Sequence, residues 1–244
     1  MIKEAIQHYK QSHGYSQFSP RCVLFDMDGV LYNSMPNHAV AWHEAMKQFG
    51  IHFTADDSYA TEGARGVDTI RKYVLEQQGK EISSEEAQRM YDVKTEIFHH
   101  MPIAEIFPGV IDIMQKIKSA GMTIGVVTGS GQRPLIKRLL NDFDGFLTED
   151  HIVTAYDVER GKPNPDPYLM GLRKTGNNNP WQGIVVENAP LGVRAGSAAN
   201  CFTIGINSGP LPDSALADNG ADIVLQQMTD LCNMWDEILQ NIDR

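Results

Sequence analysis

Positive charge is scarce in this chain: its 244 residues include 21 lysines and arginines against 31 aspartates and glutamates, for a formal net charge of −10. That balance argues against a nucleic-acid partner, because nucleic-acid backbones are bound by clustered basic side chains. No apolar run approaches the roughly 20 residues of a membrane-spanning helix. We therefore expect neither a membrane anchor nor a secretory signal. A small phosphorylated partner is compatible with this composition, since it needs only a locally positive cleft.

Cysteine is equally sparse. The three cysteines, Cys22, Cys201 and Cys232, lack the spacing of a metal site. Their odd number and their apolar or helical settings predict packing thiols in a reducing cytoplasm, with no zinc site. The 42% hydrophobic and 21% charged residues are typical of a globular protein, and the chain is long enough to bury a core that carries an inserted subdomain.

Two aspartates, Asp26 and Asp28, follow the apolar run 22–25. Residues two apart on an extended segment point the same way, so both carboxylates would face one small volume, and Gly29 lets the chain turn sharply after them. Two anions held this close repel each other unless a hard divalent cation and a lysine share their charge. Taken alone, the segment is better interpreted as a solvated Asp-x-Asp-Gly turn.

Three further segments change that interpretation. Each follows an apolar strand pattern or precedes a predicted helix, where small residues, a fixed lysine or oxygen ligands can meet a phosphate. Separately, they would be a helix cap, a surface charge and a turn. The segments are Thr128-Gly129-Ser130, Gly161-Lys162-Pro163 and Glu187-Asn188-Ala189-Pro190.

Together with Asp26-x-Asp28-Gly29, these segments resemble the four motifs of the haloacid dehalogenase superfamily, over nearly the whole chain. His38 and Trp42 resemble the His-x-x-x-Trp of the branch that contains β-phosphoglucomutase and related phosphatases. A lone histidine on an amphipathic helix is usually a partner of nearby backbone, so we place His38 outside the catalytic set; the alternative is that it positions the acid/base region or the cap hinge. The resemblance implies a Rossmann-like, doubly wound parallel sheet of the α/β class with an inserted helical cap.

The resemblance also implies a Mg²⁺-dependent phosphoryl transfer. Asp26 would be the nucleophile that forms an aspartyl-phosphate, and Asp28 the general acid and then the general base, with a pKa raised by burial beside a second carboxylate. Thr128 and the segment Gly129-Ser130 would hold phosphoryl oxygens, and Lys162 would neutralise Asp26 and the transferring group.

Two positions depart from that branch. Asn188 stands where it usually has an aspartate, and Glu62 stands in the cap where the mutase carries a basic residue. We predict that Glu62 restores the missing charge by meeting, directly or through water, a metal held by Asp26, the Asp28 carbonyl and Asn188. Glu187 would either bind the metal itself or lie just behind its ligands. Arg65, in the same cap loop, is a weaker candidate for contacting substrate phosphate.

A site tied together in this way leaves little volume, so the first substrate hypothesis is inorganic pyrophosphate, and the chain resembles the inorganic pyrophosphatases of this superfamily. The alternative is a β-phosphoglucomutase or a phosphatase of small sugar phosphates. A third possibility is a non-catalytic binding module with the same fold.

The strand and helix patterns give the expected division into domains. Residues 1–33 and 108–244 form the core, and residues 34–107, where strand signals vanish, form the cap. Residues 1–21 are expected to be an extra amphipathic helix or a frayed arm. Predicted strands lie at 22–25, 122–128, 151–154, 184–186 and 202–206, and the cap helices at 37–49, 67–78 and 84–100.

Overall fold

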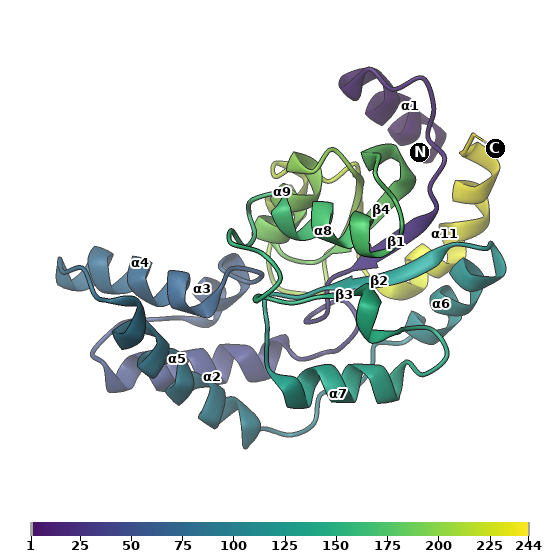
Figure 1. Ribbon diagram of the computed structural model, residues 1–244. Helices are drawn as coiled ribbons and strands as arrows, with labels where there is room; N and C mark the ends of the chain where they lie inside the picture. The colour runs from purple at the N-terminus through teal and green to yellow at the C-terminus, as the bar shows by residue number, and fades with distance from the viewer. Residues whose placement is uncertain (1, 244) are drawn as a thin grey trace.

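The computed structural model describes residues 2–243. Its centre is a sheet of six parallel strands in the order β3-β2-β1-β4-β5-β6, which confirms the predicted α/β fold (Figure 1). The strands are β1 Cys22–Phe25, β2 Thr123–Val127, β3 Ile152–Val153, β4 Gly183–Glu187, β5 Phe202–Ile206 and β6 Ile223–Leu225. Strand β6 was not predicted, although its three apolar residues exceed the two of β3, which lies within the predicted strand 151–154.

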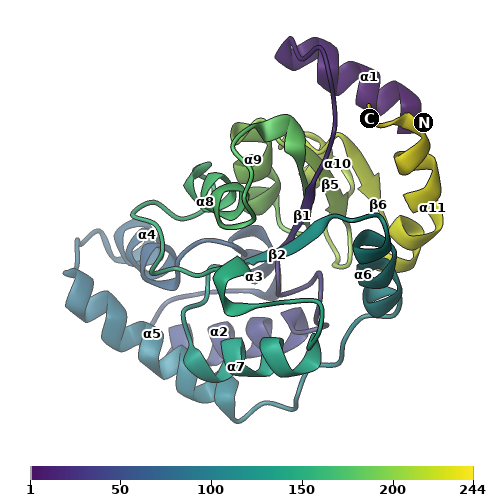
Figure 2. The same cartoon turned by 45° about the vertical axis from the view of Figure 1, so that its right-hand side comes forward.

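Alternate residues of β1 serve the two faces of the sheet, as strand geometry requires. Val23 and Phe25 pack with α1, α6, α7 and α11, whereas Cys22 and Leu24 pack with α8 and α9 (Figure 2). These helices span α1 Ile2–His13, α6 Val110–Ser119, α7 Arg133–Asp142, α8 Asp166–Lys174, α9 Pro190–Ala198 and α11 Met228–Asn241, and the short α10 spans Ser214–Ala217. Both faces are therefore covered, which is why β1 is apolar at every position.

The chain leaves the sheet after β1 and returns before α6 (Figure 1). Between these points lie α2 Met35–Gln48, α3 Ala55–Ala60, α4 Gly66–Gln78 and α5 Ser84–His99. They enclose a separate apolar cluster around Trp42, Phe53 and Ile70. The short α3 was not predicted; its start is fixed by a capping box between Thr54 and Asp57. We call α2–α5 the cap, and its exact bounds, 34–107, stay a prediction.

Residues 2–13 form the predicted amphipathic helix, and it is not frayed. Ile2, Ile6 and Tyr9 are buried, and the Tyr9 hydroxyl donates to the Asn200 carbonyl at 2.8 Å. The chain ends meet nearby, because the Lys10 ammonium lies 2.7 Å from Asp243. Met1 lies outside the described residues. Within residues 2–243, none of the helices is long and apolar enough to cross a bilayer.

Candidate active site

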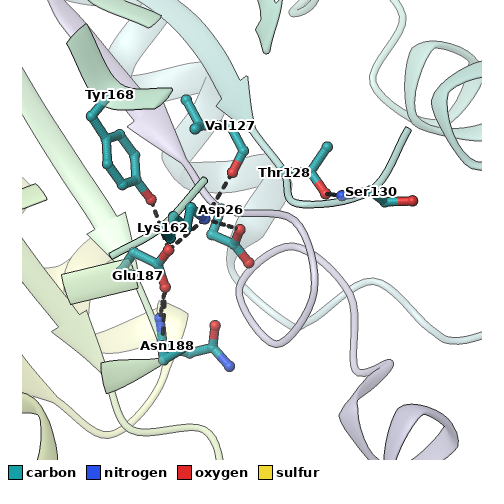
Figure 3. Close-up of polar contacts among 9 residues, drawn as sticks. Asp26, Val127, Thr128, Ser130, Lys162, Tyr168, Glu187 and Asn188 are labelled. Carbon is teal, nitrogen blue, oxygen red and sulfur yellow. Dashed lines mark hydrogen bonds and ion pairs between the residues drawn. The ribbon is translucent and has the colours of Figure 1, made fainter. Parts of the chain in front are cut away.

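The four sequence motifs meet at the carboxyl ends of β1, β2 and β4, with Lys162 arriving from the loop before α8 (Figure 3). Parallel strands place their carboxyl ends at one edge, so residues far apart in the chain become neighbours there. Asp26 and Lys162 are buried, and the Lys162 Nζ lies 2.5 Å from Asp26 Oδ1. The contact on which the sequence argument depended is therefore present.

The ammonium of Lys162 makes three hydrogen bonds, all within the protein. Besides Asp26, its ammonium donates to Glu187 Oε1 at 2.6 Å and to the Val127 carbonyl at 3.0 Å. Although burial alone disfavours the charge, the two carboxylates raise the pKa of Lys162. Lys162 is therefore a fixed positive charge under the nucleophile, with no N–H left for a ligand in this conformation.

Glu187 is equally saturated. Its Oε1 accepts from Lys162 and from the Tyr168 hydroxyl at 2.8 Å, and its Oε2 accepts from the backbone N–H groups of Asn188 and Ala189 at 2.9 and 3.1 Å. A carboxylate with four donors has little left for a metal ion. In this geometry Glu187 is the counter-charge of Lys162, which agrees with the second of its two predicted positions, behind the metal ligands.

Two buried oxygen atoms nearby remain unpaired. Asp26 Oδ2 and Asn188 Oδ1 have no hydrogen-bond partner within the described part of the chain. The Gly29 N–H donates to the Tyr32 carbonyl at 2.8 Å, so the preceding Asp28 carbonyl, antiparallel to it in a trans peptide, points away from that turn. Unpaired buried oxygens are costly, and a hard cation such as Mg²⁺ takes carboxylate, amide and carbonyl oxygens. The residues present therefore fit a divalent cation.

Carboxylate side chains alone do not build this cation site. In residues 2–243, no three His, Cys, Asp or Glu side chains converge as they would around a metal. Of the predicted ligands, Asp26 and Asn188 each carry a buried side-chain oxygen without a hydrogen-bond partner, and the ligand roles of Glu62 and Glu187 stay predictions. Burial, together with the Glu187 and Asp28 charges, raises the pKa of Asp26, and Lys162 opposes that rise. A second positive charge would complete the ionisation of the nucleophile.

Asp28 contacts a chain of cap residues that the sequence analysis missed. Its Oδ1 accepts from Ser34 at 2.6 Å and lies 3.2 Å from His38 Nε2. The His38 Nδ1 in turn lies 2.8 Å from the Lys94 ammonium, which is 2% exposed and rests over the rings of Trp42 and Phe98. These contacts with Asp28 and Lys94 agree with the alternative given for His38, that it positions the acid/base region. Lys94 gave no sequence signal, because its partner is 56 positions away.

The charge state of Asp28 also differs from the expectation. Burial would raise its pKa, but His38, the Ser34 hydroxyl and Lys94 outweigh burial and lower it. Asp28 is therefore held as an anion in this conformation, ready to accept a proton. To act as an acid it must first gain a proton, and His38 is its nearest titratable partner.

A small cavity of about 30 Å³ separates the cap from the core beside Asp28. Glu62 and Lys94 line it from the cap, and Asp28, Thr128, Gly129 and Ser130 line it from the core. Burial raises the pKa of Glu62, with His38 and Lys94 opposing. The Ser130 N–H donates to Thr128 Oγ1 at 3.0 Å, so it is not free for a phosphate here.

Comparison with known proteins agrees with this geometry. The family model described as haloacid dehalogenase-like hydrolase matches residues 23–206. The chain belongs to this family. It is 31% identical over 211 residues to hexitol phosphatase A of Escherichia coli, covering 85% of this chain and 92% of that one, and 25% identical to the beta-phosphoglucomutase of Bacillus subtilis, covering 86% and 91%. A solved protein of Bacteroides vulgatus, assigned provisionally as a beta-phosphoglucomutase, superimposes with a TM-score of 0.95 at 44% identity, covering 100% of this chain and 98% of that one.

Arg65 of this haloacid dehalogenase-like hydrolase lies outside the small cavity. Its Nε donates to Asp68 and its Nη1 to the Glu159 carbonyl, both at 2.7 Å. It lines a separate groove of about 340 Å³ together with Lys162. In this conformation the structure does not bring Arg65 to the cavity side of Asp28, and its predicted phosphate contact is not made there.

Proposed function

We propose that this hydrolase is a Mg²⁺-dependent phosphatase that works through an aspartyl-phosphate on Asp26, with small sugar or polyol phosphates as its substrates. The observation that carries the proposal is the buried contact between Asp26 and Lys162 beside two unpaired oxygens, Asp26 Oδ2 and Asn188 Oδ1. The names of the relatives, a hexitol phosphatase and a phosphoglucomutase, support sugar and polyol phosphates as the substrate class.

The residues divide the reaction into two displacements. Asp26 attacks phosphorus, the bond from phosphorus to the leaving oxygen breaks, and a protonated Asp28 gives that oxygen its proton. Asp28, now an anion beside His38, then takes a proton from the water that attacks the phosphoryl group and releases Asp26. Lys162 keeps its charge beneath Asp26 in both steps. A cation held by Asp26, Asn188 and the Asp28 carbonyl would offset the repulsion between the phosphoryl group and these carboxylates.

Inorganic pyrophosphate is the second candidate, and one observation favours it. The cavity beside Asp28 measures only about 30 Å³, which is small for the leaving group of a hexose phosphate. A compact anion needs less volume than a hexose and leaves with less help from Asp28. If Glu62 meets the cation, directly or through water, closing the cap would be coupled to metal binding.

Steady-state phosphate release with varied Mg²⁺ separates these functions. Hexitol phosphates, hexose phosphates, β-glucose 1-phosphate and pyrophosphate should be compared in the wild type and in Asp26→Asn, which we expect to be inactive on all of them. The highest kcat/KM on a hexitol or hexose phosphate supports the first proposal, and the highest on pyrophosphate the second. Interconversion of β-glucose 1-phosphate without net phosphate release would indicate a mutase, and inactivity of the wild type on the whole panel a binding module.

The role of Glu62 has its own test. Glu62→Ala should raise the Mg²⁺ concentration needed for half-maximal pyrophosphate turnover. If Mg²⁺ dependence and pyrophosphate turnover both survive the substitution unchanged, the coupling between cap and cation is wrong.

A further inference from the structure

Several glycines of the core lie in direct contact with the cap. A Cβ built on Gly209, in the loop after β5, would lie 2.8 Å from the ring of Tyr59 on α3, and one built on Gly161 would lie 2.8 Å from Cγ of Arg65. Real side chains do not approach so closely, so Tyr59 and Arg65, or the cap segments that carry them, would have to shift. Neither glycine has a positive φ, so the backbone does not require glycine there. Glycine fits at both positions because the cap residues Arg65 and Tyr59 occupy the space that a side chain would need.

The cap loop of residues 61–65 packs against a third glycine, Gly129. A Cβ on Gly129 would lie 3.1 Å from the carbonyl oxygen of Gly63. Gly63, with φ +84°, would in turn place a Cβ 3.0 Å from Cδ of Lys162. The bond from Arg65 to the Glu159 carbonyl fastens the same loop. The cap therefore seats on core loops that follow β2, β3 and β5, close to the residues that would do the chemistry.

The distance between the cap and the core determines the volume of the cavity beside Asp28. The cavity there, about 30 Å³, has room for roughly two water molecules, since one needs about 10–15 Å³. Glu62 and Thr128 face each other across it from the cap and the core. A cap held even slightly farther away would enlarge this space on every side.

We propose that Gly161 and Gly209 are specificity-determining positions, which admit compact leaving groups and exclude larger ones by letting Arg65 and Tyr59 seat directly on the core backbone. Neither glycine needs to touch the substrate. The proposal rests on the proposed function, because the volume concerned is that of the leaving group. It deepens that function by stating what limits the size of the substrate.

The test pairs a substitution that adds a Cβ at the contact between core and cap, called the wedge variant, with a second substitution that removes the cap side chain it meets. Gly209→Ala should prop the cap open, and Tyr59→Ala in the same chain should remove the obstacle. The first readout is the ratio of kcat/KM for pyrophosphate to kcat/KM for a hexitol phosphate. We expect the wedge to lower this ratio about tenfold and the double variant to return within about threefold of Tyr59→Ala alone, since residues in contact couple in this way. Gly161→Ala paired with Arg65→Ala is the independent second case.

The second readout needs no turnover. Hydrogen exchange of the 61–65 loop should become faster in each wedge variant and slow again in its pair, because a cap held open loses its cover. Gly131→Ala is the control: the three atoms nearest to its Cβ would all belong to Tyr156, an exposed core side chain. We expect that variant to leave both readouts unchanged.

Two results would overturn the proposal: an unchanged substrate ratio in both wedge variants, or wedge effects that the paired substitution does not relieve. The failure of the proposed function looks different. If the wild type releases phosphate from neither compound, the function is wrong, while exchange of the 61–65 loop still decides whether Gly209 and Gly161 seat the cap.

Discussion

Replacing Lys94 with methionine should flatten the pH dependence of unfolding. Lys94 is buried among rings of the cap, and burial lowers its pKa from 10.5 to about 8, although Glu62 and Asp28 act in the opposite direction. Each pKa unit corresponds to 1.36 kcal/mol, so burying the charged form of Lys94 costs the folded protein roughly 3 kcal/mol. Methionine keeps the length of the side chain and removes the titrating group.

The sign follows from proton binding. The Lys94 ammonium is a weaker base in the folded protein, so between about pH 8 and pH 10.5 the unfolded chain binds more protons. The free energy of unfolding therefore gains a contribution from Lys94 as the pH rises through this window, and below pH 8 the full cost of burying the charge is present. Tyrosines that titrate in the same range contribute to both proteins and cancel in the difference.

Urea unfolding of the wild type and Lys94→Met at pH 7.5, 9 and 10.5 measures that difference. We expect it to change by roughly 3 kcal/mol across the series, in favour of the wild type at high pH. Lys72→Met, at a half-exposed position on α4, is the control and should give a constant difference. A constant difference for Lys94→Met as well would refute the reasoning, since Lys94 would then keep an ordinary pKa despite its burial.

Three further predictions concern the core of the site. Asn188→Asp gives the cation set a second negative charge and should tighten Mg²⁺ binding to the free protein about tenfold by titration calorimetry; unchanged affinity would contradict a ligand role for Asn188. Gly192→Ala would place a Cβ 1.8 Å from Glu187 Oε1, so it should abolish turnover and lower the melting temperature, and a stable, active variant would disprove the packing. Tyr168→Phe removes one of four donors to Glu187 and should cost about 1.5–3 kcal/mol in urea unfolding, or nothing if that bond is absent in solution.

The catalytic edge was predictable because its signals are local. Asp26 follows an apolar strand, and Lys162 sits in a proline-rich loop before a helix. Parallel strands bring such ends together whatever their separation in the chain, so motif order was enough to predict the contact between them. The six residues of α3 are too few for a helical periodicity to show, whereas β6 is a short apolar run like the predicted β3.

The contacts of the cap were not predictable in the same way. His38 and Lys94 meet because α2 packs on α5, and no local pattern reports that crossing. The sequence also left the place of Glu187 open, either as a metal ligand or behind the ligands. The sequence shows that Glu187 is an acid near the site, but only the folded chain shows that its oxygens are already occupied by four donors.

The meeting of α1 with the end of the chain has a practical consequence. Lys10 and the Phe18 N–H both reach the Asp243 carboxylate at 2.7 Å, and the marks for the two ends lie side by side, away from α3 and α4 (Figure 1). A fluorescent reporter or a surface tether attached at either end would therefore lie away from the cap. A short linker joining the ends would let the polypeptide be reopened at an exposed loop elsewhere.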